Sequence, residues 1–230
     1  MYEKQKEFIK LLNRLADSGH RNVFDVFRDA VGAMACACEQ MSLHAEEREA
    51  RYRSIMTGYG EDERRTFAEA FAAVVEGLEY RRTSFLGPVL EEIGAANVRN
   101  GQFLTPASVS DLMARVTAPD AAARHRPGEL VTLYDPACGA GVLMISQAEE
   151  MVRAGVPPRD IYIVAGDVDP RGCDITFVEL TLLGYAARIE QRNALTLQPM
   201  SPPRYTVGYY LYGTQWREGR HQERIEHGHD

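Results

Sequence analysis

The sequence predicts an α-helical N-terminal domain over residues 1–98 and a shortened α/β domain with a parallel sheet over residues 99–212. Apolar residues recur at helical spacing through the first part, which is the pattern of packed amphipathic helices. After residue 100, short apolar runs alternate with helical segments, an order typical of a parallel sheet. Residues 213–230 are polar and charged and are expected to form a flexible tail. A chain of 230 residues can bury the cores of two such units.

The expected helices of the first domain follow from four apolar stripes. The stripes lie within residues 8–15, 23–41, 67–78 and 89–93. Glycines separate them at Gly19, at Gly58 and Gly60, and at Gly87 before Pro88. We interpret these stripes as the core of a helical bundle.

The α/β part begins with an expected helix over residues 107–116 and a polar link over 118–128. Apolar runs at 130–134, 161–167 and 187–190 read as buried strands, bounded by proline and glycine. Helical segments at 142–154 and 171–183 separate these strands, and the aromatic run at 205–212 is expected to add one more strand.

The composition and the net charge limit the kinds of partner that the protein is expected to bind. Hydrophobic residues at 45% and charged residues at 26% are ordinary for a soluble globular protein. The net charge of −7 does not fit a free-standing DNA-binding protein, which gains much of its affinity by neutralising phosphates. If the chain acts on DNA, we expect it to bind DNA weakly when alone and to depend on a partner.

The cysteines and histidines give no sign of a disulfide framework or a metal site. Cysteines 36, 38, 138 and 173 form no C-x-x-C pair, and the tail histidines 221, 227 and 229 have no companion cysteines and are expected to be solvated. The first ten residues, MYEKQKEFIK, lack the apolar stretch of a secretory signal, and no run approaches the roughly 18 apolar residues of a membrane span. The expected location is the reducing cytoplasm, with no membrane association.

The string DPACGAG at residues 135–141 carries the main chemical signal. Asp135 ends an expected strand, and the chain then turns through Gly139 and Gly141 into a helix. Glycine lets the backbone approach a ligand closely. A dinucleotide fingerprint would require glycine at position 144, where Met144 stands. An acid before the turn would repel a pyrophosphate and would attract the ammonium group of S-adenosylmethionine, so the pattern favours the methyl donor.

Polar residues follow the next two expected strands. Asp167 closes the second strand and suits hydrogen bonding to ribose hydroxyls, with Asp169 as an alternative. Asn193 follows the third strand, where its amide can bind the adenine amino group. Capping of turns is the competing interpretation of Asp167 and Asn193. Three polar residues at three successive strand ends favour the binding role.

The strings GQFLTP, DPACGAG, AGDVDP and RNALT, in this order, resemble the motif series of N6-adenine DNA methyltransferases. The likeness covers most of residues 22–197, and it is greatest to the modification subunits of type I restriction systems and to short phage- and plasmid-borne relatives. It implies a Rossmann-like class I sheet with S-adenosylmethionine as cofactor and adenine in DNA as substrate. The cofactor-binding residues that it implies are Gln102, Phe103, Thr105, Asp135, Ala137, Gly139, Gly141, Asp167 and Asn193.

The sequence departs from this family at the catalytic motif. The family carries (N/D)-P-P-(Y/F), whose polar head and carbonyl orient the target amine and whose ring stacks on the flipped base. The nearest string here is Ser201, Pro202, Pro203 and Arg204, followed by Tyr205. Serine is a weaker acceptor and arginine replaces the ring, so we interpret the string as a turn and keep Ser201, Pro202, Pro203 and Tyr205 only as weak catalytic candidates.

The length after the third strand is also short for the family. Its sheet has seven strands, and only 40 residues follow Glu190 here. A sheet cut short exposes an edge that proteins normally cover, so we expect a homo-oligomer or a partner subunit. Three hypotheses remain open: a subunit of an adenine-modification complex, an inactive cofactor-binding module that regulates or mimics a restriction–modification system, and a methyltransferase for another substrate.

Overall fold

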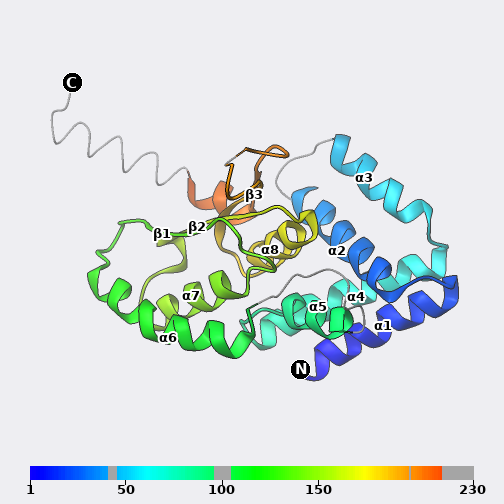
Figure 1. Ribbon diagram of the computed structural model, residues 1–230, viewed down its shortest axis with the longest axis horizontal. Helices are drawn as coiled ribbons and strands as arrows, with labels where there is room; N and C mark the ends of the chain where they lie inside the picture. The colour runs from blue at the N-terminus through cyan, green and yellow to red at the C-terminus, as the bar shows by residue number, and fades with distance from the viewer. Residues whose placement is uncertain (41–45, 96–104, 197, 214–230) are drawn as a thin grey trace.

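The computed structural model describes residues 1–40, 46–95, 105–196 and 198–213. Its helical part consists of α1 (Glu3–Gly19), α2 (Val23–Gln40), α3 (Glu46–Thr57), α4 (Glu61–Tyr80) and α5 (Leu86–Ala95). The remainder consists of α6 (Ala107–Arg124), β1 (Val131–Asp135), α7 (Val142–Arg153), the 3-10 turn η1 (Pro158–Asp160), β2 (Ile161–Asp167), α8 (Pro170–Leu182), β3 (Ala186–Gln191) and β4 (Arg204–Tyr205). The predicted order, helices first and an α/β sheet second, is confirmed (Figure 1).

The N-terminal helices pack in the way that their apolar stripes require. Phe8, Leu12 and Leu15 of α1 are buried, and α1 packs on α4. Helix α3 was not predicted, because only Met56 of its twelve residues is buried and no apolar period marks it. Its position follows from packing on α2.

The sheet has the order β1-β2-β3-β4, and its first three strands are parallel. Ile161, Ile163 and Ala165 of β2 are fully buried, because α7 and α8 pack against this strand. Strand β2 has the predicted boundaries, and β1 and β3 each differ from the predicted strands by one residue at both ends. The shortened parallel sheet is thus confirmed.

Two predicted segments are wrong. The expected link over residues 118–128 is helical as far as Arg124, because α6 continues through Pro119 and buries Ala118. The expected strand over 205–212 is limited to β4, which pairs antiparallel with β3, and residues 207–213 are helical. The hydroxyl of Thr206 ends the ladder, since it accepts a hydrogen bond from the Ala187 amide at 2.8 Å and donates to the Tyr185 carbonyl at 2.7 Å.

One hydrophobic core extends through the helical part and the sheet. Helix α8 lies between the sheet and α2 (Figure 1), and α2 packs on α8. The division at residue 98 therefore remains a prediction about domains that share a core. In the part of the chain that the structure describes, no helix has both the length and the apolar character needed to span a membrane.

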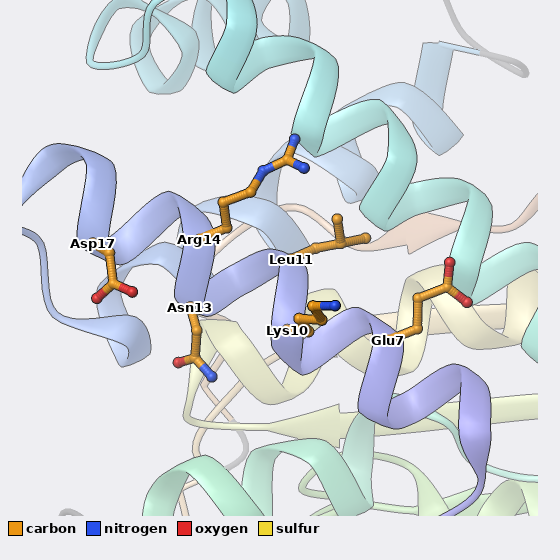
Figure 2. A pocket seen from close by; sticks show the side chains of 6 residues that line it. All are labelled: Glu7, Lys10, Leu11, Asn13, Arg14 and Asp17. Atoms are coloured by element: carbon orange, nitrogen blue, oxygen red, sulfur yellow. The ribbon is translucent and has the colours of Figure 1, made fainter.

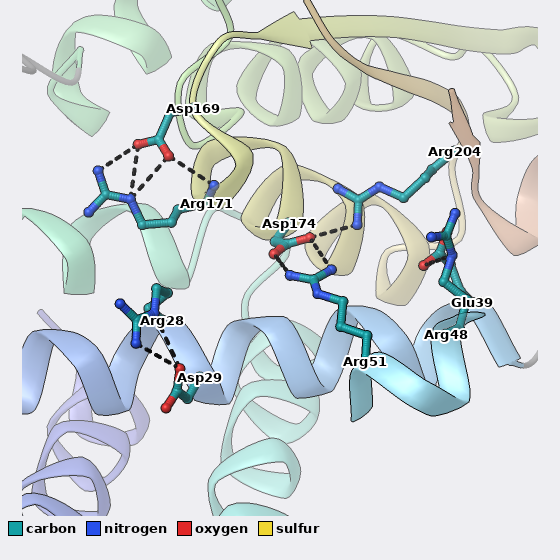
Figure 3. Close-up of polar contacts among 9 residues, drawn as sticks. All are labelled: Arg28, Asp29, Glu39, Arg48, Arg51, Asp169, Arg171, Asp174 and Arg204. Atoms are coloured by element: carbon teal, nitrogen blue, oxygen red, sulfur yellow. Dashed lines mark hydrogen bonds and ion pairs between the residues drawn. The ribbon is translucent and has the colours of Figure 1, made fainter. Parts of the chain in front are cut away.

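Two buried acids of α8, in the α/β part, form hydrogen bonds with residues of the helical part. Asp174 of α8 accepts hydrogen bonds from Arg51 of α3 and Arg204 of β4, both at 2.6 Å (Figure 3). Glu179, also on α8, accepts from the backbone amides of Phe85 at 2.5 Å and Leu86 at 2.6 Å, at the start of α5. These contacts fix the helix behind the sheet, and so they fix the strand ends that form the candidate site.

Candidate cofactor site

The parallel strands place the predicted acids along one edge of the sheet. Asp135 is the last residue of β1, Asp167 is the last residue of β2, and Asn193 follows the end of β3 by two residues. Parallel strands present their carboxyl ends on the same side, where ligands of open α/β sheets bind. The Cys138 amide donates to the Gly166 carbonyl at 2.8 Å, and this bond joins the turn after β1 to the end of β2.

The glycine turn between β1 and α7 needs its glycines for conformation and for space. Gly139 has φ 54° and Gly141 has φ 72°, in the left-handed region that favours glycine. A Cβ atom on Gly141 would lie 2.7 Å from Thr176 Oγ1. A Cβ atom on Gly172 of α8 would lie 2.5 Å from the Gly139 carbonyl oxygen. Helix α8 therefore packs directly on the turn, and Gly172 is a site residue that the sequence analysis missed.

The two predicted carboxylates are held by backbone amides. Asp167 Oδ2 accepts from the Gly139 amide at 2.7 Å, and Oδ1 accepts from the Asp169 amide at 2.8 Å. Asp135 Oδ1 accepts from the Ala137 amide at 2.9 Å. Each carboxylate oxygen has a second lone pair for a ligand donor. Asp167 is the more buried of the two, at 8% exposure, so its orientation is set before any ligand arrives.

Asn193 makes the capping contacts that were the competing interpretation, and Asp169, for which only a ribose-binding role was considered, also caps a helix. Asp169 accepts from the Arg171 amide at the start of α8, and its carboxylate pairs with the Arg171 guanidinium at 2.8 Å (Figure 3). Asn193 Oδ1 accepts from the amides of Leu195 at 2.9 Å and Thr196 at 3.2 Å. Asp167 is consequently a better candidate than Asp169 for ribose hydroxyls, and Asn193 has a structural role whether or not it binds a ligand.

Three other predicted residues precede α6. Thr105 is exposed and lies two residues before the start of that helix. Gln102 and Phe103 lie outside the described residues.

The weak catalytic candidates lie at the far end of the sheet from the glycine turn. Strand β4 follows β3 in the sheet order, so β2 and β3 separate it from β1. Ser201 and Pro203 are half-buried and Pro202 is exposed in the segment that leads into β4. The Tyr205 ring packs on the Tyr209 ring, with centroids 4.4 Å apart.

Exposed apolar side chains beside the acids were also missed by the sequence analysis. Val168, directly after Asp167, is 53% exposed, and Leu195 beside Asn193 is 94% exposed. Apolar groups next to convergent polar groups are typical of small-molecule sites. A valine after a strand-ending acid is the only signal that the sequence offers for this feature.

The turn also contains a thiol, and its environment keeps it neutral. Burial raises the pKa of the Cys138 thiol well above its usual range. A neutral thiol is a poor nucleophile, so binding by the backbone and the carboxylates is the chemistry that the turn supports.

A hollow beside α1 is separate from this site (Figure 2). Its lining comes from one helix and mixes both signs of charge: Glu7, Lys10, Leu11, Asn13, Arg14 and Asp17. It lacks the converging elements that form a binding site.

Comparisons with known proteins agree with this geometry. The model of the family described as N-6 DNA Methylase matches residues 89–218, more than half of the chain. Among solved structures, the chain is similar to a Listeria monocytogenes protein described as a class I S-adenosylmethionine-dependent methyltransferase, with 14% identity and a TM-score of 0.50. That match covers 86% of this chain and 56% of the other, so this chain spans little more than half the length of its neighbour. No curated protein matches the sequence. The family and the fold imply S-adenosylmethionine as cofactor, and by the family match this chain belongs to the N-6 DNA methylases.

Proposed function

We propose that the chain binds S-adenosylmethionine at the glycine turn and serves as the cofactor-binding subunit of a complex that methylates adenine N6 in DNA. One observation carries the proposal: the Gly139 amide and the Asp167 carboxylate are joined at 2.7 Å, so the turn after β1 and the end of β2 form one preset cradle. Preset groups lower the ordering cost of binding.

The residues of the cradle fit this cofactor by charge and by hydrogen bonding. The bound cofactor supplies a methyl group activated by a positively charged sulfonium. Asp135 places a negative charge where the ammonium of the methionine part is expected, and Asp167 offers free lone pairs to ribose hydroxyls. Ala137, Gly139 and Gly141 supply backbone that can approach closely. Val168 offers an apolar face to the adenine ring. Asn193 Oδ1 already accepts from the Leu195 and Thr196 amides, so its NH2 group is left to donate to a ring nitrogen of adenine.

A second candidate function is a cofactor-binding module without catalysis, which regulates or mimics a restriction–modification system. It is favoured by Arg204, which stands where the family has a stacking ring. Its guanidinium binds buried Asp174 at 2.6 Å and lies 4.9 Å from the Phe177 ring. Arg204 is thereby committed to the packing of β4 on α8. The two candidates share the cofactor site and differ in methyl transfer.

Isothermal titration of the purified chain with S-adenosylmethionine tests the site. Asp167→Ala should weaken binding by roughly 1.5–3 kcal/mol, or about tenfold to 150-fold, the usual range for a hydrogen bond to a charged group. Asp135→Asn keeps an oxygen for the Ala137 amide and removes only the charge, so it should weaken binding by about 1–2 kcal/mol.

Asp25→Asn is the matched control, because it removes an exposed acid of α2 and changes the net charge equally. It should leave affinity unchanged. A folded chain that does not bind S-adenosylmethionine, or one that binds equally well in all three variants, would exclude the proposed cradle.

A further inference from the structure

Thr176 is a buried polar residue of α8 at the base of the glycine turn. It is fully buried, between the equally buried apolar residues Ile175 and Phe177. A polar group in such a position is normally explained by the hydrogen bond that it makes. A threonine inside a helix ordinarily donates to a carbonyl three or four residues earlier in the same helix. The Thr176 hydroxyl donates instead to the Gly139 carbonyl oxygen of the turn, at 3.3 Å.

The turn and this face of α8 are in direct contact. Thr176 and Gly172 are four residues apart in the helix and so lie on the same face. A Cβ atom on Gly141 would lie 2.7 Å from Thr176 Oγ1 and 2.9 Å from its Cγ2. A Cβ atom on Gly172 would lie 2.5 Å from the Gly139 carbonyl oxygen. Gly172 therefore lets this carbonyl approach α8, and the Thr176 hydroxyl binds it there.

Gly139 is held at both of its backbone groups. Its carbonyl accepts from Thr176, and its amide donates to Asp167 Oδ2 at 2.7 Å. The Cys138 thiol lies 3.7 Å from the same carbonyl oxygen and from Thr176 Oγ1, but a thiol is only a weak donor. Glycine has no side chain to restrict its backbone angles. The two hydrogen bonds therefore fix the conformation of Gly139, and the one to Thr176 helps to keep its amide aimed at Asp167.

We propose that Thr176 is a positioning residue for the cofactor, which fixes the Gly139 backbone and through it orients the Asp167 carboxylate toward the ribose hydroxyls. This rests on the proposed function, in which Asp167 binds the ribose. Asp167 Oδ1 is held separately by the Asp169 amide at 2.8 Å, so the Gly139 amide is what holds the other oxygen. Thr176 is fully buried against the turn and acts on the cofactor only through these groups.

Titration of Thr176→Val and Thr176→Ser with S-adenosylmethionine tests this role. Valine keeps the branched shape and removes the donor, so the dissociation constant should rise about threefold to tenfold, the range for one neutral hydrogen bond. Serine keeps the hydroxyl and should restore the affinity to within about twofold of wild type. Rescue by serine separates the effect of the hydrogen bond from the packing of the methyl group.

Thr181→Val is the matched control on the same helix. Thr181 is buried, and its Oγ1 has no hydrogen-bond partner among the residues that the structure describes. The same substitution there should leave the affinity for S-adenosylmethionine unchanged. Urea unfolding of each variant shows whether the chains that are compared are folded. If valine at position 176 prevents folding, Thr176→Ala takes its place, since it removes the hydroxyl without filling the space beside Gly141, and its affinity loss should match that expected for valine.

A double-mutant cycle with Asp167→Ala tests the route through Gly139. In the Asp167→Ala background, Thr176→Val should change the affinity by less than about twofold, because the carboxylate on which Thr176 acts is gone. Three results would each overturn the role of Thr176 while leaving cofactor binding intact: unchanged affinity in folded Thr176→Val, a loss that serine does not restore, or an equal loss in both backgrounds. A folded wild-type chain that does not bind S-adenosylmethionine would overturn the proposed function itself.

Discussion

Gly172 determines how closely α8 can approach the glycine turn. Its backbone is helical, so alanine would ordinarily be favoured there, but a Cβ atom would lie 2.5 Å from the Gly139 carbonyl oxygen. Gly172→Ala should therefore displace the turn and lower the free energy of unfolding by about 1–3 kcal/mol, the usual cost of overpacking. Thermal and urea unfolding measure the stability, and the same sample should show weaker S-adenosylmethionine binding.

Gly94→Ala provides the control for this substitution. Gly94 lies in α5, and an added Cβ atom would meet nothing within 4 Å. Alanine there should be neutral or stabilise the protein by about 0.5–1 kcal/mol. Equal effects at the two glycines would contradict a special role for Gly172.

The residues of the site differ in how far the sequence reveals them. Asp135 and Asp167 could be predicted, because each follows an apolar run that reads as a strand and parallel strands end together. Gly172 could not, because a glycine inside a helix has no pattern and its role depends on Gly139, which lies 33 positions earlier. The capping contacts of Asn193 were foreseen as an alternative, whereas the contact of Asp169 with the start of α8 was not foreseen.

At the scale of elements, the carboxylate of Glu179 couples α8 to the start of α5. Burial raises the pKa of Glu179 from its ordinary 4.5 to about 7, although the Leu86 and Phe85 amides and the Ser84 hydroxyl oppose this. The folded state binds the proton more tightly, so stability from this group is full below pH 4.5 and is lost as pH rises through 7. The loss should be on the order of 3 kcal/mol. Urea unfolding between pH 5 and 8 measures it.

Glu179→Gln isolates this effect because it mimics the protonated acid. Its oxygen can accept from the Phe85 and Leu86 amides, and its NH2 group can donate to Ser84 Oγ. The variant should be at least as stable as wild type at pH 8 and should lose less stability between pH 5 and 8. If the variant's stability depends on pH as strongly as that of the wild type, the pH dependence comes from groups other than Glu179.

Strand β4 depends on the ion pair between Arg204 and Asp174. The side chains of these residues are 11% and 8% exposed, so removing one leaves a buried charge with fewer partners. Arg204→Ala should lower the free energy of unfolding by roughly 1.5–3 kcal/mol, less than for a fully isolated charge because Arg51 still binds Asp174. Binding of S-adenosylmethionine should be unchanged, because Arg204 lies outside the cradle.

Arg28→Ala is the matched control for Arg204. The Arg28 side chain is 52% exposed and pairs with exposed Asp25 and with Asp29 (Figure 3). Exposed pairs contribute about 0–1 kcal/mol, so this loss should be small. A similar loss in both variants would mean that Arg204 is no more than a surface residue.

The elements that could be predicted are those whose apolar pattern is local. Strand β2 is a continuous apolar run between prolines, and its boundaries matched. The segment after Thr206 has a strand-like aromatic composition, yet it is helical because Thr206 takes the hydrogen-bonding groups of Ala187. Helix α6 passes through Pro119, which reads as a breaker, because buried Ala118 holds that turn in the core.

For the whole molecule, the residues expected to bind the cofactor are far better represented than the features expected to bind DNA and its target base. The cradle lies on the carboxyl edge of the sheet, and the Arg51–Asp174 ion pair and a shared core connect the sheet to the helical part. The net charge of −7 opposes binding to a polyanion. The string nearest to a catalytic motif leads into β4, at the other end of the sheet from the glycine turn. A protein built in this way should bind the methyl donor more readily than it transfers the methyl group.

The purified chain alone should therefore methylate DNA poorly or not at all, even when it binds S-adenosylmethionine. Transfer to adenine N6 requires a base that is flipped out, stacked on an aromatic face and oriented by strong acceptors. Here Arg204 is bound to Asp174, and the Tyr205 ring packs on Tyr209. Incubation with labelled methyl donor and DNA from a methylation-deficient host measures incorporation, with cofactor binding by the same sample as the control. Robust incorporation at adenine that is lost in a Pro202→Ala, Pro203→Ala variant would show that Ser201–Arg204 is a divergent catalytic motif.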